Sequence, residues 1–163
     1  MGGSPRRAVH LASCAAMAKK VLLGYDDSEP SQRALARAVE EARPDRGEVI
    51  VLVVFEMPLD PNAPRAYGTA GDGPPDYGPY DEPPEVMAIM AAAQHRLDEA
   101  GAKAEFFWAP GEPGQMIVDA AKARDADLIV LGHSHHSLLG RLFGADTAAE
   151  VQSHAGVPVI AVD

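Results

Sequence analysis

The chain has 163 residues, a length that suits one domain, and 47% of its residues are hydrophobic, which is enough for a sizeable core. Its formal net charge of −10 argues against nucleic acid or an anionic membrane as a partner, because both reward a basic surface. The single cysteine, Cys14, permits no internal disulfide, so we expect a protein of the reducing cytoplasm.

The first residues differ in character from the rest. Arg6 and Arg7 are followed by an apolar stretch over 8–16 that resembles an export signal, and residues 11–14 fit the pattern of a lipoprotein cleavage site. His10 interrupts the apolar stretch, however, and a signal needs a clean one. We therefore expect residues 1–17 to be a disordered leader and residues 18–163 to be the folded domain, with export as the alternative.

Five apolar runs alternate with four amphipathic segments along the domain. The runs predict strands because they are apolar at nearly every position, as in strands covered on both faces. The segments predict helices because apolar residues recur at helical spacing with charges opposite. The predicted strands are 20–25, 49–55, 104–109, 128–131 and 157–162, and the predicted helices are one opened by 26–30 and continuing through 42, then 85–100, 115–124 and 147–154.

This alternation predicts the fold class. Strand, helix and strand in succession imply right-handed crossovers, which place the strands parallel to one another. We expect an α/β protein with a single doubly wound, five-stranded parallel sheet. The last strand, 157–162, carries no lysine or glutamate to discourage pairing with another chain, and we expect Pro158 to interrupt the hydrogen-bond donors of its free edge.

Residues 57–84 break the alternation. They hold eight of the fourteen prolines and the tyrosines Tyr67, Tyr77 and Tyr80, without a sustained apolar period. Because the segment follows the second strand, it leaves the carboxyl edge of the sheet, where such folds carry ligands. Two interpretations stay open: a lid with a tyrosine stacked on a base, or a surface insertion without a ligand role.

Three segments together resemble the universal stress protein family. Residues 20–31, which read Lys-Val-Leu-Leu-Gly-Tyr-Asp-Asp-Ser-Glu-Pro-Ser, are similar to its first strand and turn. Residues 125–132 resemble the strand before its glycine loop, and residues 154–162 resemble its terminal strand. The resemblance covers 18–163 and implies an adenine nucleotide alpha hydrolase-like (Rossmann-like) fold with strand order 3-2-1-4-5.

The resemblance also implies a function and an assembly. It implies a homodimer paired through the terminal strands, and a role in stress tolerance or signalling without a defined turnover reaction. The family's base-binding positions are an aspartate after the first strand and a backbone position at the end of the second, which Asp26 and Val54 match. Asp26 can also close the turn before the first helix.

The phosphate loop departs from the family pattern. Members that bind ATP carry the motif G-x2-G-x9-G-[S/T], and an ungapped alignment places Gly132, His135, Ala145 and Asp146 on its four defined positions. A shift of one residue puts Gly144 on the third glycine and Ala145 on the hydroxyl position. The hydroxyl donor is lost in either register.

Asp146 accordingly has two interpretations. As a loop residue it brings a carboxylate to the place of a phosphate, and like charges ~4 Å apart repel by about 1 kcal/mol in water and ~4 kcal/mol near a protein surface. As a structural residue, Asp146 or Thr147 caps the last helix, and 147–150 fits a capping box. We expect a dimeric regulatory module with weak or no ATP binding. The alternative is an ATP-binding member with an altered loop, with or without slow hydrolysis, in which Mg²⁺ binds only together with ATP.

The histidines at 133, 135 and 136 allow further interpretations. A zinc site is not predicted, because no fourth ligand stands at suitable spacing. The segment 132–136 is similar to a G-x-S-x-G nucleophile elbow, but its second glycine is missing, so no catalytic residue is assigned. Together with Arg141, the histidines could instead supply positive charge to a phosphate.

Overall fold

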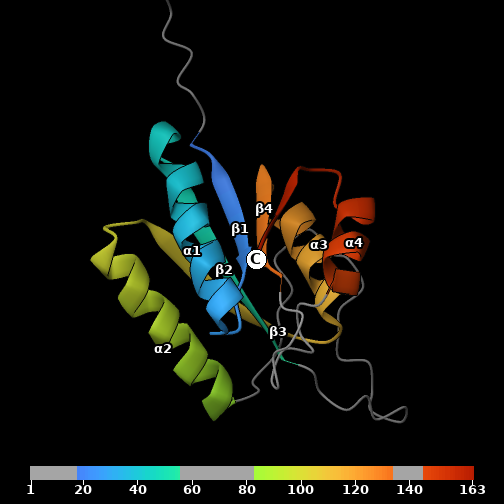
Figure 1. Cartoon of the computed structure of the whole chain (residues 1–163), viewed down its shortest axis with the longest axis horizontal. Helices are drawn as coiled ribbons and strands as arrows, with labels where there is room; N and C mark the ends of the chain where they lie inside the picture. Colours follow the sequence, from blue (N-terminus) through green and yellow to red (C-terminus); the bar gives the residue numbers. More distant parts are fainter. Residues whose placement is uncertain (1–17, 56–82, 134–144) are drawn as a thin grey trace, which may run out of the picture.

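The computed structural model describes residues 18–55, 83–133 and 145–163, so the predicted leader and residues 57–82 of the long loop lie outside the described residues. Within these ranges, five strands alternate with four helices (Figure 1). The strands are β1 (Lys20–Gly24), β2 (Glu48–Phe55), β3 (Ala104–Pro110), β4 (Leu128–Gly132) and β5 (Val159–Val162). The helices are α1 (Glu29–Ala42), α2 (Pro84–Glu99), α3 (Pro113–Ala123) and α4 (Ala145–His154), and a 3-10 turn, η1 (Arg43–Asp45), follows α1.

The strands form one parallel sheet in the order β3-β2-β1-β4-β5, which confirms the predicted fold class and strand order. Helices α1 and α2 cover one face of the sheet, and α3 and α4 cover the other (Figure 1). Because β1 lies between β2 and β4, the chain leaves it in one direction and later returns on its other side. This reversal marks the place where open α/β sheets bind ligands.

The two faces of the sheet explain why the strands are apolar at every position. Alternate side chains along a strand point to opposite faces, so a sheet covered on both sides needs apolar residues throughout. In β1, Val21 and Leu23 pack toward α1 and α2, whereas Leu22 packs toward α3 and α4. All three are fully buried. Among the described residues, no helix has the length and apolar character needed to cross a membrane.

Three predicted starts were wrong by two residues, including that of α3, which begins at Pro113 instead of 115. Helix α4 begins at Ala145, two residues earlier than expected, so Asp146 and Thr147 lie in its first turn. Neither is the cap, and Thr147 and Glu150 cannot be the two ends of a capping box, since that pair spans the cap and the third helical residue. Strand β5 begins at Val159, later than the predicted 157.

Candidate functional site

The carboxyl ends of the three central strands bring the predicted base-binding residues together. Gly24, the last residue of β1, pairs with Leu52 on one side and Leu131 on the other. The ladder continues past it, because the Tyr25 N–H donates to the carbonyl of Leu52 at 2.9 Å. Asp26, Val54 and His133 each come two residues after this row of paired residues, so three segments distant in sequence meet at this edge.

The alternation of peptide groups along β2 indicates the direction of those of Val54. Peptides of a parallel strand alternate between its two neighbours. In β2 the odd-numbered residues bond to β3, as the 2.9 Å bond from the Val49 N–H to Lys103 shows, and the even-numbered ones bond toward β1, as the Leu52 carbonyl does. Since β1 ends at Gly24, Val54 turns a donor and an acceptor toward the space past the end of that strand. A paired donor and acceptor suits the edge of a base.

Asp26 is half-buried and closes the turn before α1, as predicted for its structural role. Its Oδ1 accepts from the Ser28 N–H at 3.0 Å and from the Ser28 hydroxyl at 2.5 Å. The Ser28 hydroxyl in turn accepts from the Ser31 N–H at 3.3 Å and caps α1. A carboxylate offers about four acceptor positions, so this turn leaves Asp26 able to accept from a ligand as well.

Gly132 has a packing role that its place in the loop motif did not reveal. A Cβ at this position would lie 2.5 Å from the Ser31 nitrogen and 2.6 Å from the carbonyl carbon of Pro30, both backbone atoms of the first turn of α1. No side chain fits there, because Cβ atoms do not approach backbone within 3.0 Å. The glycine therefore lets α1 begin directly against the end of β4.

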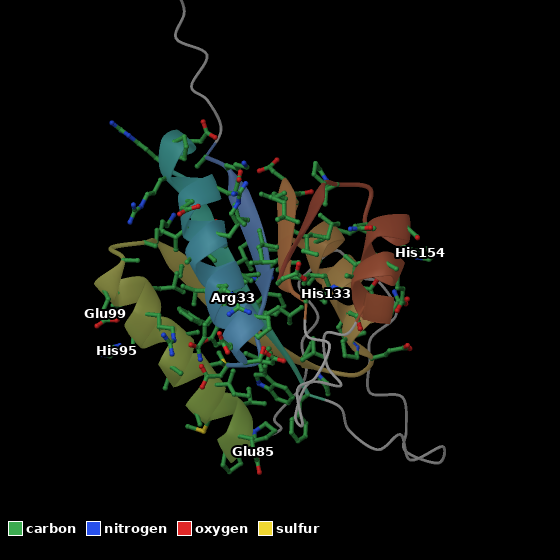
Figure 2. All side chains as sticks on the ribbon, viewed as in Figure 1. Arg33, Glu85, His95, Glu99, His133 and His154 are labelled. Carbon is green, nitrogen blue, oxygen red and sulfur yellow. The ribbon has the colours of Figure 1, made fainter. Side chains whose placement is uncertain are left out.

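The remaining loop positions are described in part. His133 lies at the carboxyl edge (Figure 2), and its N–H donates to the carbonyl of Val162 at 2.6 Å, which joins the end of β4 to β5. His135 lies outside the described residues, and Ala145 and Asp146 are placed through their backbone in the first turn of α4. Within 18–55, 83–133 and 145–163, which exclude His135 and His136, no three His, Cys, Asp or Glu residues gather as metal ligands.

A second aspartate, Asp27, follows Asp26 in the turn, and the sequence alone assigned it no role in binding. Its backbone has φ 61°, in the left-handed region that non-glycine residues rarely adopt. The Tyr25 hydroxyl donates to its Oδ1 at 2.8 Å, and Gln32 Nε2 donates to its carbonyl at 3.0 Å. From the sequence alone, an aspartate after the end of a strand is only a weak indication of a role in the site. The bond to Tyr25 could not be predicted, because this tyrosine looks like any other apolar strand residue in the sequence.

Comparison with known proteins gives consistent results. The family model described as Universal stress protein family matches residues 17–163. Universal stress protein Rv1636 of Mycobacterium tuberculosis is 30% identical over 151 residues, covering 88% of this chain and 95% of that protein. The structure of a universal stress protein from Archaeoglobus fulgidus has a TM-score of 0.63 at 26% identity, covering 89% of this chain and 98% of the other. A universal stress protein solved in complex with cAMP has a TM-score of 0.62 at 24% identity, covering 89% and 96%.

Proposed function

Because the chain belongs to the universal stress protein family, we propose that it is a regulatory module of the stress response that holds an adenine nucleotide at the carboxyl edge of β1, β2 and β4. The observation that supports this proposal is the register of the central strands, in which Gly24 pairs with Leu52, so that Asp26 and Val54 each follow two residues later at the same edge of the sheet. Asp26 accepts hydrogen bonds and the Val54 peptide both donates and accepts, which matches the amino group and ring nitrogens of adenine.

The phosphate side of the site favours a nucleotide with one phosphate over one with three. In the aligned loop, Asp146 replaces the hydroxyl donor, and this residue lies in the first turn of α4. Each added phosphate brings more negative charge toward it, so binding of ATP is weak or absent, whereas a nucleotide with one phosphate is affected less. The solved relative that holds cAMP is an example of such a ligand in another member of this fold.

The alternative is a site that binds ATP through an altered loop. The amino end of α4 lies at the same edge of the sheet, and the unpaired N–H groups of a helix start attract phosphate. Mg²⁺ bound together with ATP would supply positive charge that offsets the repulsion between Asp146 and the phosphates. The proposal predicts that AMP binds more tightly than ATP, whereas the alternative predicts that ATP binds at least as tightly when Mg²⁺ is present. Titration calorimetry with and without Mg²⁺ measures both affinities.

The test of base recognition compares AMP with IMP. AMP carries an amino group on the purine where IMP carries an oxo group. Wild-type protein should bind AMP more tightly. In Asp26→Asn, the oxygen stays with Ser28 and the amide NH₂ takes the place of the second oxygen, so the variant donates where the wild type accepts. Loss of a hydrogen bond to a charged group costs about 1.5–3 kcal/mol, so AMP affinity should fall about 10- to 150-fold while IMP affinity does not fall.

A matched control is Asp119→Asn, which removes the same charge from an exposed position of α3. It should leave both affinities unchanged. Equal binding of AMP and IMP by the wild type would contradict recognition of the base by Asp26. Absence of binding for both would contradict the nucleotide function as a whole.

We propose in addition that the module is a homodimer paired through β5. The Ile129 N–H donates to the Pro158 carbonyl at 3.0 Å and the His133 N–H donates to Val162, so the even-numbered residues of this segment face β4. Val159 and Ala161 therefore turn their peptide groups to the free edge. The expectation that Pro158 interrupts the donors of that edge was wrong, because Pro158 faces β4 instead.

Ala161→Pro tests this pairing. Proline removes the N–H that faces the edge and leaves the peptides that bond to β4 in place. In a two-fold dimer each contact occurs twice, so two lost hydrogen bonds of about 0.5–1.5 kcal/mol each raise the dimer dissociation constant about 5- to 150-fold. Light scattering over a concentration series measures this change.

The control for the dimer test is Ala161→Ser, which keeps the N–H at the same exposed position. Its association should equal that of the wild type. Ile160 is a poorer target, because its side chain packs against the core under α1 and α2 and a charge there would disturb the monomer too. A monomeric wild type at tens of micromolar would exclude the dimer.

A further inference from the structure

The turn that carries Asp26 is fixed on both sides by its neighbours. Tyr25 precedes it and is fully buried in the core beneath α1 and α2, so it is a rigid anchor. Asp27 follows it in the left-handed conformation, where it needs support from outside the backbone. The 2.8 Å hydrogen bond from the Tyr25 hydroxyl to Asp27 Oδ1 joins the two flanking residues directly and leaves Asp26 between them.

Two hydrogen bonds from Gln32 reinforce the bond between Tyr25 and Asp27, which together form a clamp on the turn. Gln32, one turn into α1, donates from Nε2 to the Asp27 carbonyl at 3.0 Å and to Oδ1 at 3.3 Å. Burial and then the neighbouring Asp27 raise the pKa of Tyr25 well above its usual value, and Arg96 of α2 acts in the opposite direction. The hydroxyl therefore remains a protonated donor throughout the pH range in which the protein is handled.

We propose that the hydrogen-bonded pair Tyr25–Asp27 is a positioning device that sets the orientation of the Asp26 carboxylate and thereby the preference for an amino over an oxo group on a bound purine. The inference rests on the proposed function, and it adds two residues that do not touch the base. Oδ1 of Asp26 is engaged by Ser28, so the direction of the second oxygen depends on how firmly residues 25–28 are held. A loosened turn would let that oxygen leave the plane of the base.

A double-mutant cycle on the ratio of AMP to IMP affinity tests the pair. Tyr25→Phe removes only the hydroxyl and keeps the ring in the core. Asp27→Gly removes the acceptor and keeps the left-handed backbone at no steric cost. Each change should lower the AMP preference about three- to ten-fold, as expected for one hydrogen bond. The double variant should lose less than the sum of the two single losses, because both single variants remove the hydrogen bond between Tyr25 and Asp27.

Asp27→Asn is the conservative control. Asparagine tolerates the left-handed region and still presents an oxygen to the tyrosine, so the variant should keep the wild-type preference. A merely structural role for the pair would instead lower AMP and IMP affinity equally in the Tyr25→Phe and Asp27→Gly variants. That result would overturn the inference, and so would additive effects in the cycle.

A measurement without ligand separates this inference from the proposed function. The Ser28 N–H is bonded to Asp26, so its hydrogen exchange reports how well the turn is held. We expect exchange of that amide to quicken about three- to ten-fold in Tyr25→Phe and to stay unchanged in Asp27→Asn. Unchanged exchange in Tyr25→Phe would overturn the clamp even if AMP binds. If the wild type binds neither AMP nor IMP, the proposed function and the role of the pair in selectivity are both overturned. Faster exchange of the Ser28 amide in Tyr25→Phe would then show only that the Tyr25–Asp27 pair holds the turn.

Discussion

The variant that combines His135→Gly, Ala145→Gly and Asp146→Ser is expected to bind Mg-ATP about ten- to thousand-fold more tightly than the wild type. The three changes restore the aligned glycines and the hydroxyl donor of the loop motif, and they remove the negative charge of Asp146. Repulsion of about 1–4 kcal/mol between like charges ~4 Å apart corresponds to about one to three decades of affinity. The base side of the site, at Asp26 and Val54, is unchanged.

Thermal shift and calorimetry measure this gain. A ligand stabilises the native state by RT ln(1 + [L]/Kd), so sub-millimolar Mg-ATP should raise the wild-type melting temperature little and that of the triple variant more. Asp119→Ser is the matched control, since it removes one exposed carboxylate from α3 without restoring the loop. No gain in the triple variant would show that the base side does not hold adenine, and a large shift of the wild type would favour the ATP-binding alternative.

Gly132→Ala is expected to destabilise the protein by about 1–3 kcal/mol, the usual cost of an added methyl group in a packed interior. The new Cβ would overlap backbone atoms of Pro30 and Ser31, which cannot rotate away as the end of a side chain could. For a chain of this size, the melting temperature should fall by roughly 2–12 °C. Calorimetry or circular dichroism of the ligand-free protein measures the change.

The control for this substitution is Gly101→Asn. Gly101 has φ 64°, and a Cβ added there would meet no other atom within 4 Å. Asparagine tolerates that conformation, so stability should change little. The pair of variants separates contact with α1 from the general cost of replacing a glycine. A Gly132→Ala protein as stable as the wild type would mean that α1 can shift away from β4 freely.

The local part of the site followed from the sequence. Asp26 closes the turn before α1 because a short acidic side chain just before a helix start bonds to nearby backbone N–H groups, and such bonds depend on a few adjacent residues. The end of the chain was less predictable. Residues 157–162 read as one apolar run, but β5 begins at Val159, and the direction of the Pro158 peptide depends on its pairing with Ile129, which lies far earlier in the chain.

By itself, the sequence determined the fold class, and the strand order followed from its resemblance to a known family. Continuous apolar runs such as 49–55 require cover on both faces, and their alternation with amphipathic helices permits a doubly wound parallel sheet. The tertiary structure decided what each residue of the site contacts. Gly132 is needed because of Ser31, Val54 lies past the level at which β1 ends at Gly24, and Asp27 accepts a hydrogen bond from a buried tyrosine. These relations depend on register and on close approach between elements distant in the chain, and neither leaves a periodic signal in the sequence.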